Sequence, residues 1–161
     1  MKTAGNIAIR FAHDHELEQT VRLRWLWNVV EREQPSALGE AAFVQQAAEW
    51  ARAHSTTHLA HIAVTAAGEI IGMAWLALTP RVATTESFER VSADLQSCYV
   101  LPSHRQRGIG GALVQAVLAT ARERGAEHVT VHTSADSIGM YARNGFEKHD
   151  RLLLASLGQA Y

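Results

Sequence analysis

Apolar residues recur along the chain at two spacings, which divides it into predicted strands and helices. Residues 7–11 alternate between apolar and polar positions, as a half-buried strand does. A helix is expected next, with Asp14 as its N-cap, because apolar residues then recur every four positions at Leu17, Val21, Trp25 and Val29. Pro35 breaks this pattern, and a second helix is predicted around Phe43, Ala47, Trp50 and His54.

The middle of the chain predicts a β-hairpin followed by a long loop. Residues 58–64 and 70–78 form two apolar runs around the turn at 66–68, which favours paired strands. Residues 79–94 are polar and aperiodic, and we expect an irregular loop there. A short strand over 95–100 is then predicted to end before Pro102.

The last third continues the alternation of helices and strands. A helix is predicted from Gly108 to Gly125, then a strand over 129–133, a short helix over 137–143 and a last strand over 151–157. This order is typical of a mixed α/β fold. The length of 161 residues favours a single domain over 1–161.

Composition and charge exclude several classes of protein. Fifteen Lys and Arg against sixteen Asp and Glu, without blocks of one sign, argue against a nucleic-acid partner. Cys98 is the only cysteine, so neither an intrachain disulfide nor a cysteine-based zinc site can form. No metal is expected, because His58 and His61 would lie on opposite faces of one strand. Residues 1–6 carry no signal sequence, and the longest apolar run, 70–78, is far below the ~20 residues of a membrane span, so a cytoplasmic protein is expected.

A glycine-rich segment carries the strongest chemical signal. It follows a strand, opens a helix and reads Arg105, Gln106, Arg107, Gly108, Ile109, Gly110, Gly111 and Ala112. The first amides of a helix have no partner within the helix, and glycines let an anion approach them closely. The segment therefore suits a pyrophosphate, although a glycine-rich corner that binds nothing would look the same. A dinucleotide-binding domain fits less well, since the glycines lack the G-x-G-x-x-G order.

With its neighbours, this segment resembles the acetyl-CoA motif of the GNAT N-acetyltransferase superfamily. The strand, Pro102, Arg105, Gly108 and Gly110 fall at the family's positions, and the strong resemblance covers about residues 95–150. The second block of the family is matched by a strand followed by Tyr-x-x-x-Gly-Phe at 141–146. Two residues depart from the pattern: Gln106, where glycine or a small residue is usual, and Ser134, where asparagine is frequent.

The resemblance implies a fold and a co-substrate. The fold would be a mixed six- to seven-stranded sheet with about four helices, splayed between its fourth strand, 95–100, and its fifth, 129–133. Acetyl-CoA would insert its pantetheine into the splay beside Cys98, Tyr99 and Val100, and its pyrophosphate would bind the amides of Gln106 to Ala112. Ser134 would bond the cofactor or orient the adjacent turn.

The resemblance also implies direct acetyl transfer to a primary amine. Tyr141 matches the family's general acid, and its alternative role is packing against Phe146. Asp94 stands where some branches carry a glutamate base, and its alternatives are a solvated loop acid or a strand cap. Cys98 as an acyl carrier lacks an identifiable base. The open alternatives are transfer of a longer acyl group and a non-catalytic acyl-CoA sensor, and the acceptor is unidentified. Trp25 and Trp27 cannot face the same way on a helix, so one of them could line the acceptor site or a homodimer contact.

Overall fold

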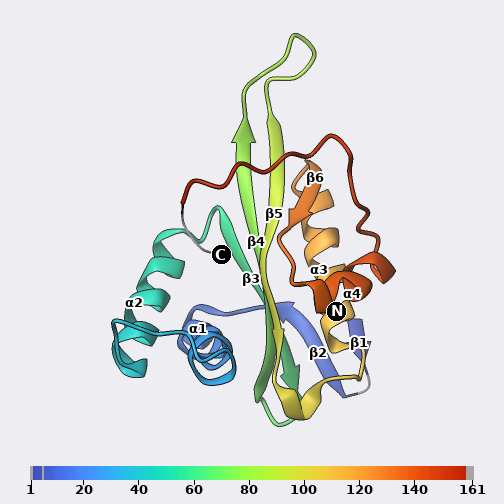
Figure 1. The fold of residues 1–161 in the computed structure, drawn as a ribbon. Helices are drawn as coiled ribbons and strands as arrows, with labels where there is room; N and C mark the ends of the chain where they lie inside the picture. The colour runs from blue at the N-terminus through green and yellow to red at the C-terminus, as the bar shows by residue number, and fades with distance from the viewer. Residues whose placement is uncertain (1, 5, 159–161) are drawn as a thin grey trace.

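A six-stranded sheet forms the centre of the structure, a computed structural model that describes residues 2–4 and 6–158 (Figure 1). Its strands follow one another in space in chain order: β1 (Lys2–Ala4), β2 (Ile7–Phe11), β3 (His58–Thr65), β4 (Ile70–Arg81), β5 (Arg90–Val100) and β6 (Ala126–Val131). Neighbouring strands are antiparallel except β5 and β6, which are parallel. The predicted mixed sheet is therefore confirmed, and β1 is a strand that the sequence did not indicate.

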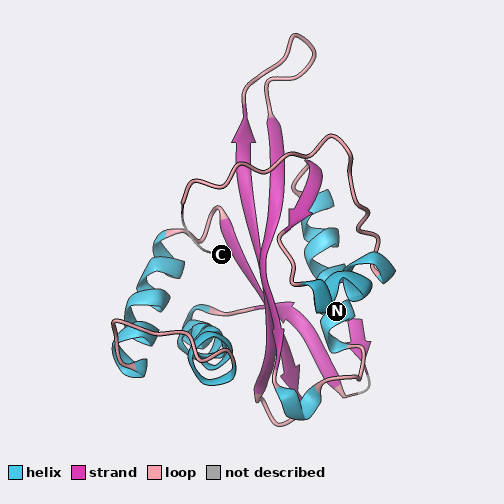
Figure 2. Ribbon diagram, in the orientation of Figure 1, coloured by secondary structure: helices cyan, strands magenta, loops and turns pink. Residues whose placement is uncertain are grey.

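Four α-helices cover the two faces of this sheet in the described part of the chain. Helices α1 (Leu17–Trp25) and α2 (Glu40–Ala53) lie on one face, and α3 (Ile109–Glu123) and α4 (Ile138–Arg143) lie on the other (Figure 2). A 3-10 turn precedes α1, and a π-helical turn over Leu26–Glu31 continues it. Helix α1 thus ends in a widened turn, a feature that often occurs near functional sites.

The strands have two buried faces because α-helices lie on both sides of the sheet. On the α3 face the core includes Leu76, Leu95 and Leu113, and on the α1 face it includes Ile62 and Met73. Strand β3 shows how alternation divides these faces, since His61 bonds Thr120 of α3 while His58 faces α2. Burial lowers the pKa of His61 to about 4, so this imidazole is neutral at physiological pH. The prediction that the two histidines lie on opposite faces is confirmed.

Strands β5 and β6 separate part of the way along their length. Their register runs from Val91 opposite Ala126 to Leu95 opposite Val131, and β5 then continues to Val100 without β6 beside it. At the same point the register between β4 and β5 shifts, which leaves Gln96 as an extra residue. Such a bulge bends a strand and increases its twist. The expected splay is confirmed, and a bulge marks its origin.

The predicted loop over 79–94 is wrong at both ends. Strand β4 continues to Arg81 and β5 begins at Arg90, so only residues 82–89 form the loop. Arg90 stabilises this extension by donating to the carboxylate of Glu127 at 2.7 Å and to the carbonyl of Val82 at 2.8 Å. Polar residues mislead here because a hairpin that projects beyond the helices has no apolar face to bury (Figure 1).

The predicted strand over 151–157 is also wrong, since these residues form no strand. The run Arg-Leu-Leu-Leu-Ala-Ser-Leu contains no β-branched residue and does not alternate, so it has weak strand propensity. Its leucines are largely exposed, Leu153 at 91%. Within the described residues, no helix is long and apolar enough to cross a membrane.

Asp14 is not the N-cap that the sequence suggested. The 3-10 turn begins at Asp14 itself, after His13, and Glu16 satisfies the free amide of His13 at 2.8 Å. Arg10 of β2 donates two further bonds to Glu16, each of 2.7 Å. Hydrogen bonding from Arg10 is the largest cause that lowers the pKa of Glu16 to about 2, and the bond from the His13 amide lowers it further. A tertiary ion pair with β2 therefore fixes the start of α1.

Candidate active site

The glycine-rich segment presents a row of unpaired amides at the start of α3. Gly108 is the N-cap with φ +76°, and no side chain caps the helix. The amide of Ala112 donates to the carbonyl of Gly108, but the amides of Gln106 to Gly111 have no acceptor among the described residues. The helix dipole adds positive potential at the same place. Helix starts of this kind suit anions, and the predicted pyrophosphate role of these amides stays a prediction.

Gly110 is not required by the packing of the protein itself. A Cβ placed there would meet no atom within 4 Å, and its φ lies outside the left-handed region. Glycine at a helical position costs roughly 0.5–1 kcal/mol relative to alanine. The residue therefore leaves space above the amides at some cost in stability, as expected where a ligand must approach closely.

Arg105 lies beside these amides but directs its charge elsewhere. Its Nε donates to the carbonyl of Val100 at 2.9 Å, and its terminal nitrogen bonds Glu31 at 2.8 Å. Its guanidinium also lies over the ring of Tyr99, 5.3 Å from the centroid. Arg105 thus ties the loop to β5 and to the π-turn after α1. Arg107 is exposed and has no ionic partner in the described residues, so it is the cation that remains available to a phosphate.

Cys98, Tyr99 and Val100 lie on the part of β5 that extends beyond β6. Burial raises the pKa of the Cys98 thiol to about 12, which opposes a role as nucleophile, and its Sγ lies 3.9 Å from the carbonyl of Gly110. Tyr99 points to the opposite face and stacks on Trp27 at 5.8 Å. The thiol therefore lies beneath the start of α3, on the side where the cofactor is predicted.

Tyr141 is buried on α4, on the same face as Cys98. Its ring meets Phe146 edge-on at 5.4 Å, and burial, followed by the nearby Cys98, raises the pKa of its hydroxyl. The phenol therefore keeps its proton at neutral pH. Tyr141 also lines a groove of about 980 Å³ that includes β6, α4 and the C-terminal segment, and no residue of the glycine-rich loop lines that groove.

Two polar residues hold the start of α3 against α4. Gln115 donates to the backbone carbonyl of Asn144 at 3.2 Å, and Asn144 donates to the carbonyl of Met140 at 2.8 Å. A Cβ at Gly111 would approach the Asn144 side chain to 3.2 Å, so a larger residue there would require that side chain to shift by a few tenths of an ångström. Ser134, predicted to contact the cofactor, is exposed at the start of the turn before α4 and bonds Ser137 at 3.3 Å.

Asp94 lies just before the point where the strands separate. It stands opposite Thr130 of β6, whose hydroxyl donates to its carboxylate at 2.9 Å. Its neighbours Ala93 and Leu95 are buried on the α3 face, so Asp94 points to the α1 face. The carboxylate is partly exposed there, next to the splay.

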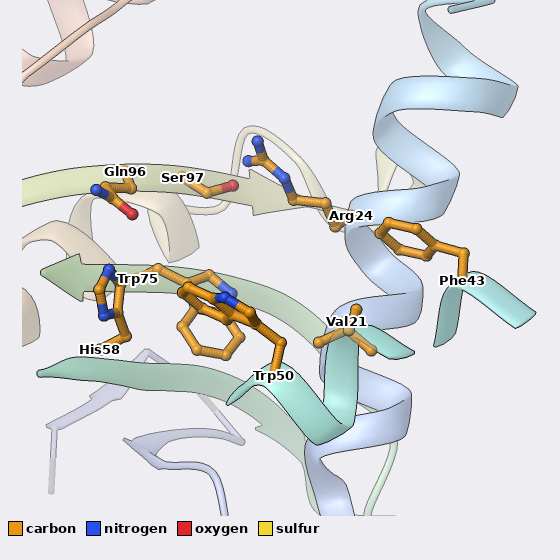
Figure 3. A pocket seen from close by; sticks show the side chains of 9 residues that line it. Val21, Arg24, Phe43, Trp50, His58, Trp75, Gln96 and Ser97 are labelled. Atoms are coloured by element: carbon orange, nitrogen blue, oxygen red, sulfur yellow. The ribbon is translucent and has the colours of Figure 1, made fainter. Parts of the chain in front are cut away.

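A second cavity, of about 240 Å³, lies on the α1 face of the sheet (Figure 3). Its lining combines aromatic rings with one arginine and a short polar stretch of β5: Val21, Arg24, Phe43, Ala47, Trp50, His58, Trp75, Gln96 and Ser97. Because Ser97 and Cys98 are consecutive on β5, this cavity and the Cys98 side of the sheet are separated by a single strand.

The sequence reasoning missed Arg24 and Ser97 as candidate site residues. Arg24 follows Val21 by three positions, so it lies towards the buried side of α1, where a charged residue is unusual. Two successive polar residues, Gln96 and Ser97, interrupt the alternation of a buried strand and could have indicated the bulge.

Comparison with known proteins assigns the family. The profile described as the acetyltransferase (GNAT) family matches residues 20–146, and the chain belongs to this family. The fold agrees with a crystal structure of an acetyltransferase from Trypanosoma brucei, at a TM-score of 0.69 and 23% identity over 94% of this chain and 99% of the other. A predicted acetyltransferase with acetyl-CoA from Clostridium acetobutylicum has a TM-score of 0.75 at 17% identity, with 94% and 96% covered.

Sequence similarity to a curated protein is more limited in extent. A glucosamine 6-phosphate N-acetyltransferase of Trypanosoma brucei brucei is 29% identical over 90 residues, which is 56% of this chain. The match spans 59% of that relative's length. The comparison agrees with the family assignment and leaves the acceptor of this chain open.

The unusual residue Gln106 provides a test of the loop. Its φ of +59° places it in the left-handed region, where a side chain is disfavoured and glycine is not. We expect Gln106→Gly to raise the free energy of unfolding by up to about 1 kcal/mol, measured by urea denaturation. Ser103→Gly, at a nearby position without positive φ, should lower it instead. If both variants lower the free energy of unfolding equally, Gln106 does not have the left-handed conformation described here.

Proposed function

We propose that this protein transfers the acetyl group of acetyl-CoA directly to the primary amine of an acceptor. The observation that carries the proposal is the row of unpaired amides from Gln106 to Gly111 beside the splay of β5 and β6. The row suits the pyrophosphate, and the splay gives the pantetheine a strand edge to pair with, next to Cys98 and Val100. The acetyl-CoA named for the structural relative from Clostridium acetobutylicum supports the choice of co-substrate.

The reaction needs three groups around one carbon atom. A neutral amine attacks the thioester carbonyl, so that a C–N bond forms and the C–S bond then breaks. The carbonyl oxygen carries negative charge in between, and a backbone N–H on the free edge of residues 96–100 is the proposed donor to it. The amine loses one proton to a base, the departing thiolate gains one from an acid, and the products are the N-acetyl amine and CoA.

The two faces of the sheet supply the two substrates. Tyr141 and Cys98 lie on the α3 face, and the cavity with Gln96 and Ser97 lies on the α1 face. Past Leu95 no strand of the described chain pairs with the β6 side of β5, so a thioester inserted there would be open to both faces. In this arrangement the acceptor approaches from the α1 side and CoA leaves on the α3 side.

Cofactor binding is tested by Gly110→Glu. The new carboxylate would occupy free space in the unliganded protein and repel the pyrophosphate, so the variant should fold normally. We expect its affinity for acetyl-CoA, measured by calorimetry, to fall by at least about 100-fold, which corresponds to about 2.7 kcal/mol.

Gly39→Glu is the matched control. Gly39 is the N-cap of α2 and, like Gly110 in the first turn of α3, has open space around its Cβ, but its helix lies on the opposite face of the sheet (Figure 2). It should bind acetyl-CoA as the wild type does. If both variants bind acetyl-CoA with equal affinity, the pyrophosphate does not bind at the start of α3.

Tyr141 is the proposed general acid for the thiolate. Its hydroxyl stays protonated because burial raises its pKa, and the nearby Cys98 places it on the cofactor side of β5. Tyr141→Phe keeps the contact with Phe146, so we expect kcat to fall by about 10²–10⁴ with little change in acetyl-CoA affinity. A kcat within about twofold of wild type would make Tyr141 a packing residue and leave water as the acid.

Asp94 is the proposed base, acting on the amine through a water molecule. It does not line the cavity, and its carboxylate is held by Thr130 beside the splay. We expect Asp94→Asn to lower kcat/KM and to flatten the acidic limb of its pH profile, with acetyl-CoA affinity retained. Asp136→Asn, which alters an exposed acid before α4, should leave the profile unchanged. A profile with the same acidic limb in Asp94→Asn would transfer the role to another group or to solvent.

A further inference from the structure

The cavity of about 240 Å³ on the α1 face is lined by Arg24, a cation that no acidic residue in the described part of the chain neutralises. Resting on the proposed acetyl transfer, we propose that its acceptor is a small amine that also carries an acidic group, a carboxylate or a phosphate, and that Arg24 binds this group. Three features of the cavity support this: the lack of an acidic partner for Arg24 among the described residues, the unpaired hydroxyl of Ser97, and the composition of the walls.

Arg24 differs from the arginines that hold the fold together. Arg10, Arg52 and Arg105 each contact a carboxylate, whereas Arg24 has no acidic partner among the described residues. It is nevertheless half-buried, and its guanidinium carbon lies 5.7 Å from the centroid of the Trp27 ring.

The surroundings of Arg24 favour an incoming anion. Arg32 lies on the same tryptophan ring at 5.6 Å, so a second positive charge stands close by. Burial and then Arg32 lower the pKa of Arg24, yet a guanidinium remains charged at neutral pH. An anion that entered the cavity would relieve this repulsion and would meet the planar donor pattern that binds carboxylates and phosphates.

Ser97 adds a donor that the protein leaves unused. Ser97 is only 4% exposed, and its Oγ has no hydrogen-bond partner among the residues that the structure describes. Buried hydroxyls normally have partners, because an unpaired one loses its bonds to water without replacement. Figure 3 shows the Arg24 side chain extending from α1 towards the strand that carries Ser97, and both residues line the cavity. We therefore include Ser97 with Arg24 as a donor to the acidic group in the proposal.

The walls disfavour a polycationic acceptor. No Asp or Glu lines the cavity, so a polyamine or another polycation would meet Arg24 without a counter-charge. Phe43, Trp50 and Trp75 surround the remaining space with rings, which suits an apolar body next to the acidic group. The volume of about 240 Å³ fits a small amine, and in the proposed arrangement its amine end lies towards Gln96, where the splay begins.

The test compares amines that differ only in the acidic group. Phenylalanine is paired with phenethylamine, and phosphoethanolamine with ethanolamine, so the two pairs separate a carboxylate from a phosphate. Binding is measured by tryptophan fluorescence, since Trp50 and Trp75 line the cavity, and turnover by thiol release. We expect the acidic member of at least one pair to bind about tenfold more tightly than its neutral partner and to have the higher kcat/KM.

The assignment to Arg24 is tested by matched variants on one helix. Arg24→Gln should abolish the preference for the acidic amine, and Arg24→Lys should retain part of it. Arg22→Gln removes the same charge two residues away, from an exposed pair with Glu40, and should retain the preference in full. Acetyl-CoA affinity should be unchanged in all three variants.

The outcomes separate this inference from the proposed reaction. If the wild type neither binds acetyl-CoA nor turns over any amine, the proposed reaction is contradicted. Tighter binding of the acidic amine, measured by fluorescence and dependent on Arg24, would still support the acidic acceptor. Equal binding of both members in both pairs, a preference for the neutral members, or a preference that survives Arg24→Gln would overturn the inference.

Discussion

The separation of β5 from β6 is the feature on which the rest of the site depends. The two strands pair as far as Leu95, where Gln96 enters as an extra residue and bends β5 away. Beyond that point the backbone of residues 96–100 has a free edge in the middle of the protein. A sheet normally closes such an edge with another strand, so an internal one is costly unless a ligand pairs with it. The glycine-rich loop follows the end of this strand, which places the anion site next to the open edge.

A second set of contacts joins the cofactor loop to the helices on the other face. Arg105 binds the carbonyl of Val100 and the carboxylate of Glu31, and its guanidinium covers Tyr99. Tyr99 in turn stacks on Trp27, within the π-turn that continues α1. Arg24 and Arg32 lie over the same tryptophan. The proposed acceptor site and the predicted phosphate site are therefore connected by one chain of side chains around the splayed strand.

Local signals in the sequence predicted the elements of the cofactor side. Gly108 and Gly125 mark the ends of α3 through backbone conformations that glycine adopts easily, with φ of +76° and +73°. The apolar period of α3 and the strand before it were also predicted from nearby residues alone. The splay was predicted from the family resemblance. The predicted roles of Tyr141 and Asp94 depend on bound substrates and stay predictions, although the structure places both residues next to the splay.

Features that depend on distant partners could not be predicted in this way. The hairpin extends to Arg81 and Arg90 because Glu127, far away in the sequence, holds its base. The start of α1 is fixed by Arg10 and Glu16 rather than by a local cap. The spacing from Val21 places Arg24 towards the buried side of α1, but only the structure shows that it has no acidic partner among the described residues.

The central claim is that the amides at the start of α3 bind the pyrophosphate of acetyl-CoA. Amide NMR spectra of the ¹⁵N-labelled protein, recorded during titration with CoA, test it most directly. The account predicts that the largest shifts occur at the amides of Gln106 to Gly111, which have no acceptor in the described structure, and that NAD causes no comparable change. Saturable CoA binding that leaves these amides unshifted would contradict it.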